Sequence, residues 1–340
     1  MSSSVSNART QLAQVIKKAR IHLYKPIQVA EILYRHRIGE GIDLGDPTTY
    51  RTQSRQWRDS VTTAIYNAHS TSSAGYQDDL FNKQLPPPLM EDLGAANQDG
   101  SVEKYIYEAV KDRLSEVHQI LPTLSVASSG NPNLSGLVAT FADSPGLSRS
   151  VDKVFEIVTY AVVSLFLTHY QIRIRSTIGV PVLKQNLSSS QFISALHGDS
   201  DQLDQDAMVF RMGVANAADA GIDMWSNFGP GFQTKHIELN SNELKEISEK
   251  FTGQRLVVVV RSVSSEVNDQ FVNKAIAIGS KLICVLTLAD LQNLLDEIIA
   301  TDSSRETEFR RIVSAEVAKE FGGNEGLENL EELGRTRNYW

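Results

Sequence analysis

Several features that define common protein classes are scarce in this sequence. Its 340 residues include one cysteine, Cys284, so no disulfide forms within the chain and no cysteine cluster exists for structural zinc. No apolar run reaches the about 18 residues that a membrane-spanning helix needs. The first residues also lack the basic-then-apolar pattern of a secretory signal. We therefore expect a cytoplasmic protein without a membrane partner.

The short motifs of several large enzyme classes are absent as well. The chain has no Gly-x-x-x-x-Gly-Lys-(Ser/Thr) loop for nucleoside triphosphates, no Gly-x-Ser-x-Gly elbow and no His-Glu-x-x-His zinc motif. ATP hydrolysis, serine hydrolysis and structural zinc are therefore poor interpretations.

Basic residues are concentrated near the N-terminus of an otherwise acidic chain. The net charge is −8, yet residues 1–60 contain ten Lys and Arg against five Asp and Glu. A positive region on an acidic body suits a protein that meets a polyanion on one face. The alternative is a solvated helix surface. Six basic residues are candidates for contact with nucleic acid: Lys18, Arg20, Lys25, Arg51, Arg55 and Arg58.

Periodicity predicts that the first part of the chain is mainly helical. Apolar residues at three-to-four spacing indicate helices over residues 8–38, interrupted at Pro26, and over residues 101–120. Pro86-Pro-Pro88 predicts an extended connection. The turn-rich residues 125–136 mark a boundary. We expect a helical N-terminal region over residues 1–140.

The pattern changes from about residue 148. An α/β (α+β) fold, with a mixed central sheet flanked by helices, is expected over residues 148–300, followed by a C-terminal helix and tail over residues 301–340. The apolar runs Val257–Val260 and Leu282–Leu286 indicate central strands covered on both faces. The expected helices span residues 151–170, 241–251, 267–278, 289–298 and 304–320, and the expected strands span residues 171–175, 208–214, 255–261 and 281–288.

A β-hairpin over residues 221–239 carries the most chemistry. Its turn is predicted at Gly229-Pro-Gly231, and a strand with period-two alternation follows from Phe232. Gln233 and Lys235 share one face of that strand. Asp223 precedes the turn by about as much as Lys235 follows it, so we expect the two to be near neighbours across the hairpin. An acid, an amide and an ammonium together suit metal-dependent phosphodiester hydrolysis.

The hairpin resembles the motif of the PD-(D/E)XK nuclease superfamily, in which an Asp is followed by (Asp/Glu)-x-Lys. Here Asp223 is followed by Gln233-Thr-Lys235, so Gln replaces the usual acid, and Gly-Ile stands where the motif has Pro. Residues 18–34, 71–81 and 223–236 resemble type II restriction endonucleases of the HaeII group. The resemblance implies a PD-(D/E)XK core over residues 148–300 and DNA recognition by residues 1–140.

The resemblance also implies roles for individual residues. Asp223 would be the anionic ligand of Mg²⁺, with the Gln233 amide and the Thr234 carbonyl as further oxygen donors. Glu156, an acid on the helix before the sheet, would complete the catalytic site unless it forms a structural salt bridge to Lys153 or Arg173. Lys235 would lie beside the attacking water, unless it is an ordinary exposed lysine.

The implied function is site-specific cleavage of double-stranded DNA by a homodimer, with a cognate DNA methyltransferase as a genetic partner. Two alternatives remain open. One is a nuclease of the same fold that reads DNA structure or methylation. The other is a DNA-binding protein whose catalytic site has decayed, which the Gln at position 233 favours.

Overall fold

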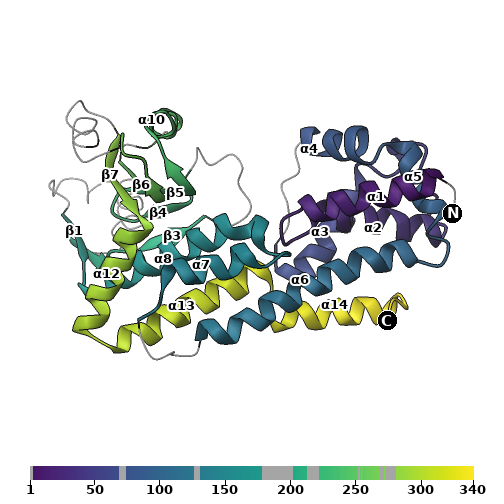
Figure 1. Cartoon of the computed structure of the whole chain (residues 1–340). Helices are drawn as coiled ribbons and strands as arrows, with labels where there is room; N and C mark the ends of the chain where they lie inside the picture. The colour runs from purple at the N-terminus through teal and green to yellow at the C-terminus, as the bar shows by residue number, and fades with distance from the viewer. Residues whose placement is uncertain are drawn as a thin grey trace, which may run out of the picture. The chain divides into compact units, whose positions relative to one another are not determined.

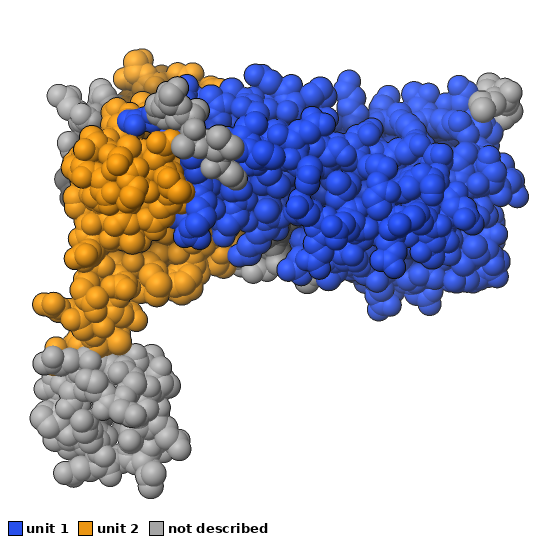
Figure 2. Space-filling model, turned by 90° about the horizontal axis from the view of Figure 1, so that it is seen from below, with its two compact units in different colours: residues 1–157, 213–219, 310–340 blue, residues 158–212, 220–309 orange. Residues whose placement is uncertain are grey.

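The computed structural model describes residues 3–68, 74–125, 131–177, 202–212, 222–251, 253, 255–267, 272 and 281–340 (Figure 1). The chain forms two compact units (Figure 2). The described part of the first unit comes from residues 1–157 and 310–340, and that of the second from residues 158–212 and 220–309. In the sequence, the second unit is therefore inserted into the first. The domain limits expected for DNA recognition and cleavage remain predictions.

The first unit is built from helices. These are α1 (Ser3–Lys18), α2 (Tyr24–Arg37), α3 (Gln53–Tyr66), α4 (Ala74–Asp78), α5 (Pro87–Ala95), α6 (Ser101–Ser125), α7 (Leu134–Asp143) and α14 (Asn324–Thr336), with short helical turns at Pro47–Thr49, Asp79–Gln84 and Ser148–Ser150. Two further helices cross the limits of the units: α8 (Val151–His169) and α13 (Ser304–Phe321). Residues 26–33 of α2 are all buried, because α1, α3, α5 and α6 pack around this helix. The buried residues include the polar Gln28 and Glu31, and both side chains form hydrogen bonds to neighbouring helices.

Prolines begin helices in this unit, and two expectations about them are wrong. The break expected at Pro26 within residues 8–38 instead lies at residues 19–23, where Leu23 has a φ of 43°, and Pro26 lies in the first turn of α2. Likewise Pro87 starts α5 after an extended Pro86. A proline fits there because the first N–H groups of a helix have no partner within the helix. The helix predicted at residues 101–120 is confirmed by α6. Helix α7 was not predicted, and residues 126–130 of the expected boundary lie outside the described residues.

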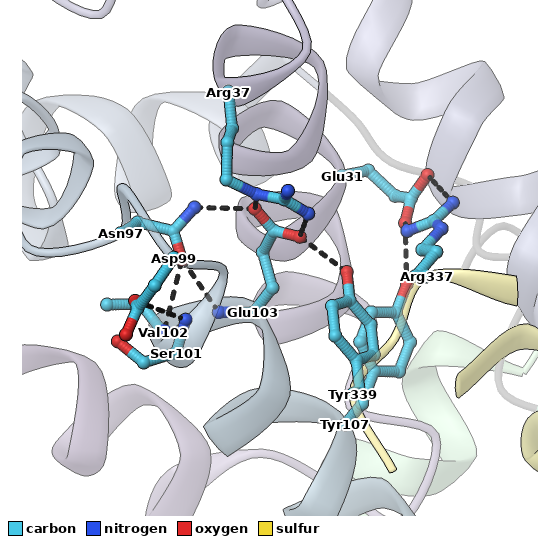
Figure 3. Close-up of polar contacts among 10 residues, drawn as sticks. All are labelled: Glu31, Arg37, Asn97, Asp99, Ser101, Val102, Glu103, Tyr107, Arg337 and Tyr339. Atoms are coloured by element: carbon cyan, nitrogen blue, oxygen red, sulfur yellow. Dashed lines mark hydrogen bonds and ion pairs between the residues drawn. The ribbon is translucent and has the colours of Figure 1, made fainter. Parts of the chain in front are cut away.

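The C-terminal residues pack against helices that are distant in the sequence (Figure 3). Arg337 donates two hydrogen bonds to the Glu31 carboxylate, at 2.5 Å to Oε1 and 3.0 Å to Oε2. The Tyr107 hydroxyl also donates to Glu31, at 2.6 Å. Tyr339, two residues after Arg337, donates a hydrogen bond from its hydroxyl to the buried carboxylate of Glu103. The C-terminal residues thereby add hydrogen bonds to two buried acids, of which Glu103 also accepts from Arg37 and Asn97.

The second unit contains a mixed sheet and confirms the predicted fold class. Its described elements are β1 (Arg173–Thr177), β2 (Gln202–Asp206), β3 (Val209–Arg211), β4 (Met224–Ser226), β5 (Gly231–Leu239), α10 (Ser241–Lys250), β6 (Leu256–Val263), β7 (Leu282–Thr287) and α12 (Leu288–Thr301). Strands β1 and β2 form an antiparallel pair. The main sheet has the order β3-β4-β5-β6-β7, antiparallel from β3 to β5 and parallel from β5 to β7.

The apolar strand β6 lies inside this sheet, and α10 supplies much of the cover over one face. Phe251, which follows α10, belongs to a buried cluster with Leu256, Val258 and Val260 of β6. A capping box, in which Asn240 accepts from the Glu243 N–H and Glu243 accepts from the Asn240 N–H, starts α10, the helix expected over residues 241–251. On the same sheet, α12 contacts β6 and β7.

The second apolar run is not central as expected. Strand β7 is the last strand of the sheet in the described part of the chain, and its residues 283–287 are only half-buried. An apolar run shows that a strand is covered, but it does not show the position of the strand in the sheet. The helix predicted over residues 267–278 lies almost entirely outside the described residues. None of the described helices is both long and apolar enough to cross a bilayer.

Candidate active site

The predicted hairpin is formed by β4, a turn at residues 227–230, and β5. Ser226 holds the turn closed: its N–H and its hydroxyl both donate to the Pro230 carbonyl, at 3.2 and 2.8 Å. Gly229 has a φ of 113°, in the region that favours glycine. The turn therefore depends on the Gly-Pro pair that identified it in the sequence.

The register of the hairpin brings Asp223 beside Gln233. Met224 pairs with Phe232, and the Asp223 N–H donates to the Phe232 carbonyl at 2.9 Å. The sequence suggested that Asp223 lies opposite Lys235, because both residues are equally far from the turn. In the structure Asp223 lies opposite Gln233 instead, two residues away from Lys235. Asp223 Oδ2 accepts hydrogen bonds from the Thr234 N–H at 2.7 Å and from the Thr234 hydroxyl at 3.1 Å. One carboxylate oxygen is thus anchored to β5, and Oδ1 accepts no hydrogen bond within the described residues.

Gln233 and Lys235 lie on the same face of β5 in different environments. Gln233 is buried, with 8% of its surface exposed, whereas Lys235 is exposed. Across the described part of the chain, neither side chain makes a hydrogen bond or an ion pair. A shift in the pairing of β5 with β6 begins directly after Lys235. The hairpin therefore brings together an acid, an amide and an ammonium that has no ion pair with any described residue.

An aromatic pair occupies the same face of the sheet and was not predicted. Phe210 of β3 is directly opposite Trp225 of β4, and the rings stack with centroids 4.4 Å apart. Trp225 is 44% exposed, which is unusual for so large an apolar side chain. Side chains alternate along a strand, so Trp225 and Asp223 project from the same face. The spacing of two residues between Asp223 and Trp225 could have predicted from the sequence that both side chains lie on one face.

Glu156 is buried on α8 and has a cationic partner. It is 2% exposed, and the Lys153 ammonium lies 2.6 Å from its Oε2 atom. Of the two salt bridges considered from the sequence, the structure contains the one to Lys153. Arg173 instead pairs with acids of β2. Glu156 belongs to the first unit and Asp223 to the second, so joint ligation of a metal by these acids remains a prediction.

The donors on the hairpin fit a hard divalent cation in kind. The Asp223 carboxylate, the Gln233 amide oxygen and the Thr234 backbone carbonyl are all oxygen ligands, which Mg²⁺ prefers. Within the described residues, no group of three or more His, Cys, Asp and Glu side chains is arranged to hold a metal. A divalent cation bound to the single carboxylate of the hairpin therefore needs further oxygen donors, such as water, a substrate phosphate or a further acid.

Three of the six basic candidates lie close together at the junction of α1 and α2. Lys18 and Arg20 are exposed and make no ion pair in the part of the chain that the structure describes. Lys25 pairs with the Asp79 carboxylate and donates to the Gln84 amide oxygen at 3.3 Å. These residues remain predicted contacts with nucleic acid.

The other three basic candidates lie on or just before α3 and differ in exposure. Arg51 is half-buried and pairs with Asp78, and Arg55 is also half-buried. Arg58 is fully buried, with its guanidinium 2.6 Å from the Asp59 carboxylate. Arg58 has no free surface in this structure, and its burial argues against the predicted contact with nucleic acid.

Comparison with known proteins identifies the family. The model of the HaeII restriction endonuclease family matches residues 8–339. The type II restriction enzyme HaeII of Haemophilus aegyptius is 36% identical over 308 residues, which cover 89% of this chain and 87% of the relative. The type II restriction enzyme NgoBI of Neisseria gonorrhoeae is 33% identical over 355 aligned residues, covering 100% of this chain and 98% of the relative. Both units fall within these matches, and the chain belongs to the HaeII restriction endonuclease family.

Proposed function

We propose that this chain is a type II restriction endonuclease, which hydrolyses phosphodiester bonds at a specific sequence in double-stranded DNA with Mg²⁺ as cofactor. The observation that carries the proposal is the hairpin of Asp223, Gln233 and Lys235 in a chain of this family. The hairpin supplies oxygen ligands and an ammonium on adjacent strands, which hydrolysis of an anionic ester requires.

Each residue of the hairpin has a chemical task in this proposal. Asp223, Gln233 and the Thr234 carbonyl would hold the cation, and a bound Mg²⁺ supplies positive charge to the phosphate and favours deprotonation of the attacking water. Thr234 fixes Asp223 Oδ2, so the orientation of the carboxylate is set before substrate arrives. The Lys235 ammonium, which has no ion-pair partner among the described residues, would offset the negative charge that builds on the phosphate oxygens.

Several properties of the assembly belong to the same proposal. Glu156 would add a second carboxylate to the cation site, which Gln233 leaves short of one negative charge. A two-fold homodimer would match a palindromic site, because each chain contributes one hairpin and each DNA strand needs one cut. We place the protein in the cytoplasm, where a cognate methyltransferase would protect the host's own sites.

Plasmid cleavage with Mg²⁺ tests the proposal directly. Wild-type protein should give discrete fragments, whereas Asp223→Ala and Lys235→Ala should each reduce the rate by about a hundredfold or more, because each removes charge from the reacting centre. Both variants should still bind DNA when Ca²⁺ replaces Mg²⁺. Lys245→Ala, an exposed lysine of α10, is the matched control and should cut like the wild type.

Other outcomes would favour the alternatives. A smear of products, or cleavage only of methylated DNA, would indicate a nuclease that reads structure or methylation. DNA binding without cleavage under any divalent cation would indicate a decayed catalytic site.

Glu156 needs a separate experiment, because its buried ion pair with Lys153 could also stabilise the fold. We expect Glu156→Gln, which keeps the shape of the side chain, to raise the Mg²⁺ concentration needed for half-maximal cleavage, or to abolish cleavage, without unfolding the protein. A loss of stability with normal cleavage by the folded fraction would assign Glu156 to the fold alone.

A further inference from the structure

Strands β3 and β4, beside the hairpin site, carry apolar side chains that solvent can reach. Within the described residues, the exposed large apolar side chains are Ile38, Tyr105, Tyr170, Met208 and Trp225. Two of them, Met208 and Trp225, lie next to the half-buried Phe210, which follows Met208 by two residues and is directly opposite Trp225. We call Met208, Phe210 and Trp225 the β3–β4 patch. Exposed apolar side chains that gather in this way indicate a contact surface, whereas single ones do not.

The Trp225 ring is supported from β3 and left uncovered from β5. Its indole stacks on the Phe210 ring with the two planes 21° apart. On the other side of β4, the residue opposite Trp225 is Gly231, which has no side chain. Met208 and Phe210 also line a cavity of about 670 Å³, so the patch is open beside β3 as well. The indole therefore has a fixed orientation and an accessible surface.

The β3–β4 patch adjoins the Asp223 carboxylate. Two residues along a strand span about 7 Å, whereas one base step of a DNA strand rises by about 3.4 Å. Trp225 is thus about two base steps from Asp223, on the side of the hairpin turn. Lys235 follows Gln233 by two residues and lies on the opposite side. A DNA strand with one phosphate at Asp223 would therefore have its neighbouring nucleotides within reach of the indole.

We propose that Trp225 packs its indole against a nucleotide next to the scissile phosphate and so holds that phosphate in position at Asp223. Phe210 keeps the indole in place. DNA is the occupant because the patch continues the face of the sheet that carries Asp223, Gln233 and Lys235, so this inference rests on the proposed endonuclease function. A large, rigid aromatic ring suits the task, because every nucleotide offers an apolar ring face or edge to it.

Substitution of Trp225 tests the contact. Trp225→Ala should bind duplex DNA with Ca²⁺ in place of Mg²⁺ about tenfold more weakly or worse, which is the usual effect of losing one aromatic contact to a nucleotide. It should also lower kcat by about tenfold, because the phosphate is less well positioned. Trp225→Phe should recover most of both losses. The salt dependence of binding should not change, since no charge is removed. Tyr105→Ala, which removes an exposed aromatic ring of α6, is the control and should behave like the wild type.

Tryptophan emission reports the contact without relying on cleavage. The chain has three tryptophans, and Trp57 and Trp340 pack against the core of the first unit, which leaves Trp225 as the reporter in the second. Addition of duplex DNA with Ca²⁺ should change the emission of the wild type, and Trp225→Phe should lose most of that change. The thermal midpoint of Trp225→Ala should stay close to the wild-type value, because the side chain is 44% exposed.

The possible outcomes separate this inference from the proposed function. If the wild type cleaves DNA, while Trp225→Ala binds and cuts equally well and the emission does not respond to DNA, the inference is overturned and the endonuclease function stands. Emission that changes with protein concentration in the absence of DNA would place Trp225 between two copies of the chain and would also overturn it. DNA binding with a change in Trp225 emission, but without cleavage under any divalent cation, would refute the endonuclease function and leave the contact with DNA standing.

Discussion

Replacing Arg337 with methionine tests whether the last residues of the chain stabilise the helical unit. The substitution removes both hydrogen bonds to Glu31, a carboxylate that is 1% exposed, while keeping an apolar stem of similar length. The loss of one partner from a buried ion pair costs about 3–5 kcal/mol. The Tyr107 hydroxyl still donates to Glu31, which places this case near about 3 kcal/mol. Loss of the guanidinium from its position 3.9 Å from the centroid of the Tyr34 ring adds to the cost.

Urea unfolding followed by tryptophan fluorescence provides the assay, since Trp57 and Trp340 both report on the first unit. With an m-value of about 2 kcal/mol/M, the midpoint should fall by about 1.5 M. Arg335→Met, an exposed arginine at the end of α14, is the matched control and should shift the midpoint little. The double variant Glu31→Leu with Arg337→Met should recover part of the loss, because it leaves no buried charge behind. Equal stability of Arg337→Met and Arg335→Met would refute this reasoning.

Three other predictions concern local packing, capping and pH. Gly326→Ala should destabilise the first unit by about 2–3 kcal/mol in urea unfolding, because a Cβ atom would lie 2.1 Å from the Ile65 carbonyl oxygen. Gly323→Ala should be nearly neutral, because its Cβ atom would make only an ordinary van der Waals contact, 3.7 Å from the Ala318 Cβ atom. Asn240→Ala should lower stability by about 1 kcal/mol through loss of the α10 cap, and no change in the thermal midpoint would contradict this. Burial lowers the pKa of His22 in the folded protein. The contribution of His22 to the free energy of unfolding is therefore complete above its ordinary pKa and is lost as the pH falls towards its pKa in the folded protein. His22→Phe should reduce the slope of the free energy of unfolding against pH in this acidic range by up to about 1.4 kcal/mol per pH unit.

The features that could be predicted from the sequence are those that neighbouring residues determine. The Gly-Pro turn, the period-two strand after it and the helix expected from residue 241 each depend on a few adjacent residues, and the structure contains all three. The helical first part and the mixed sheet also follow from apolar periodicity.

Features that depend on distant contacts could not be predicted. The strand register places Asp223 opposite Gln233, and this register depends on how many residues form the turn. Counting equal distances from the centre of the turn predicted Lys235 instead, two residues away. Arg58 looked like an exposed basic residue because nothing local shows that Gln28, Tyr24 and Tyr76 surround it. Nor does the sequence show that β7 lies at the end of the described sheet, because strand order is set by the packing of the whole unit.

The pairing of residue 31 with residue 337 also bears on the order in which the protein is made. Synthesis proceeds from the N-terminus, so α2 and α6 emerge long before α14 and the residues that follow it. During that interval Glu31 lacks Arg337 and Glu103 lacks Tyr339, so each acid has only the partners from the first part of the chain, Tyr107 for Glu31 and Arg37 with Asn97 for Glu103. The helical unit is therefore completed last, after the sheet that carries the hairpin has been translated. A chain terminated after β7 but before Arg337 would contain the hairpin but lack a finished helical unit.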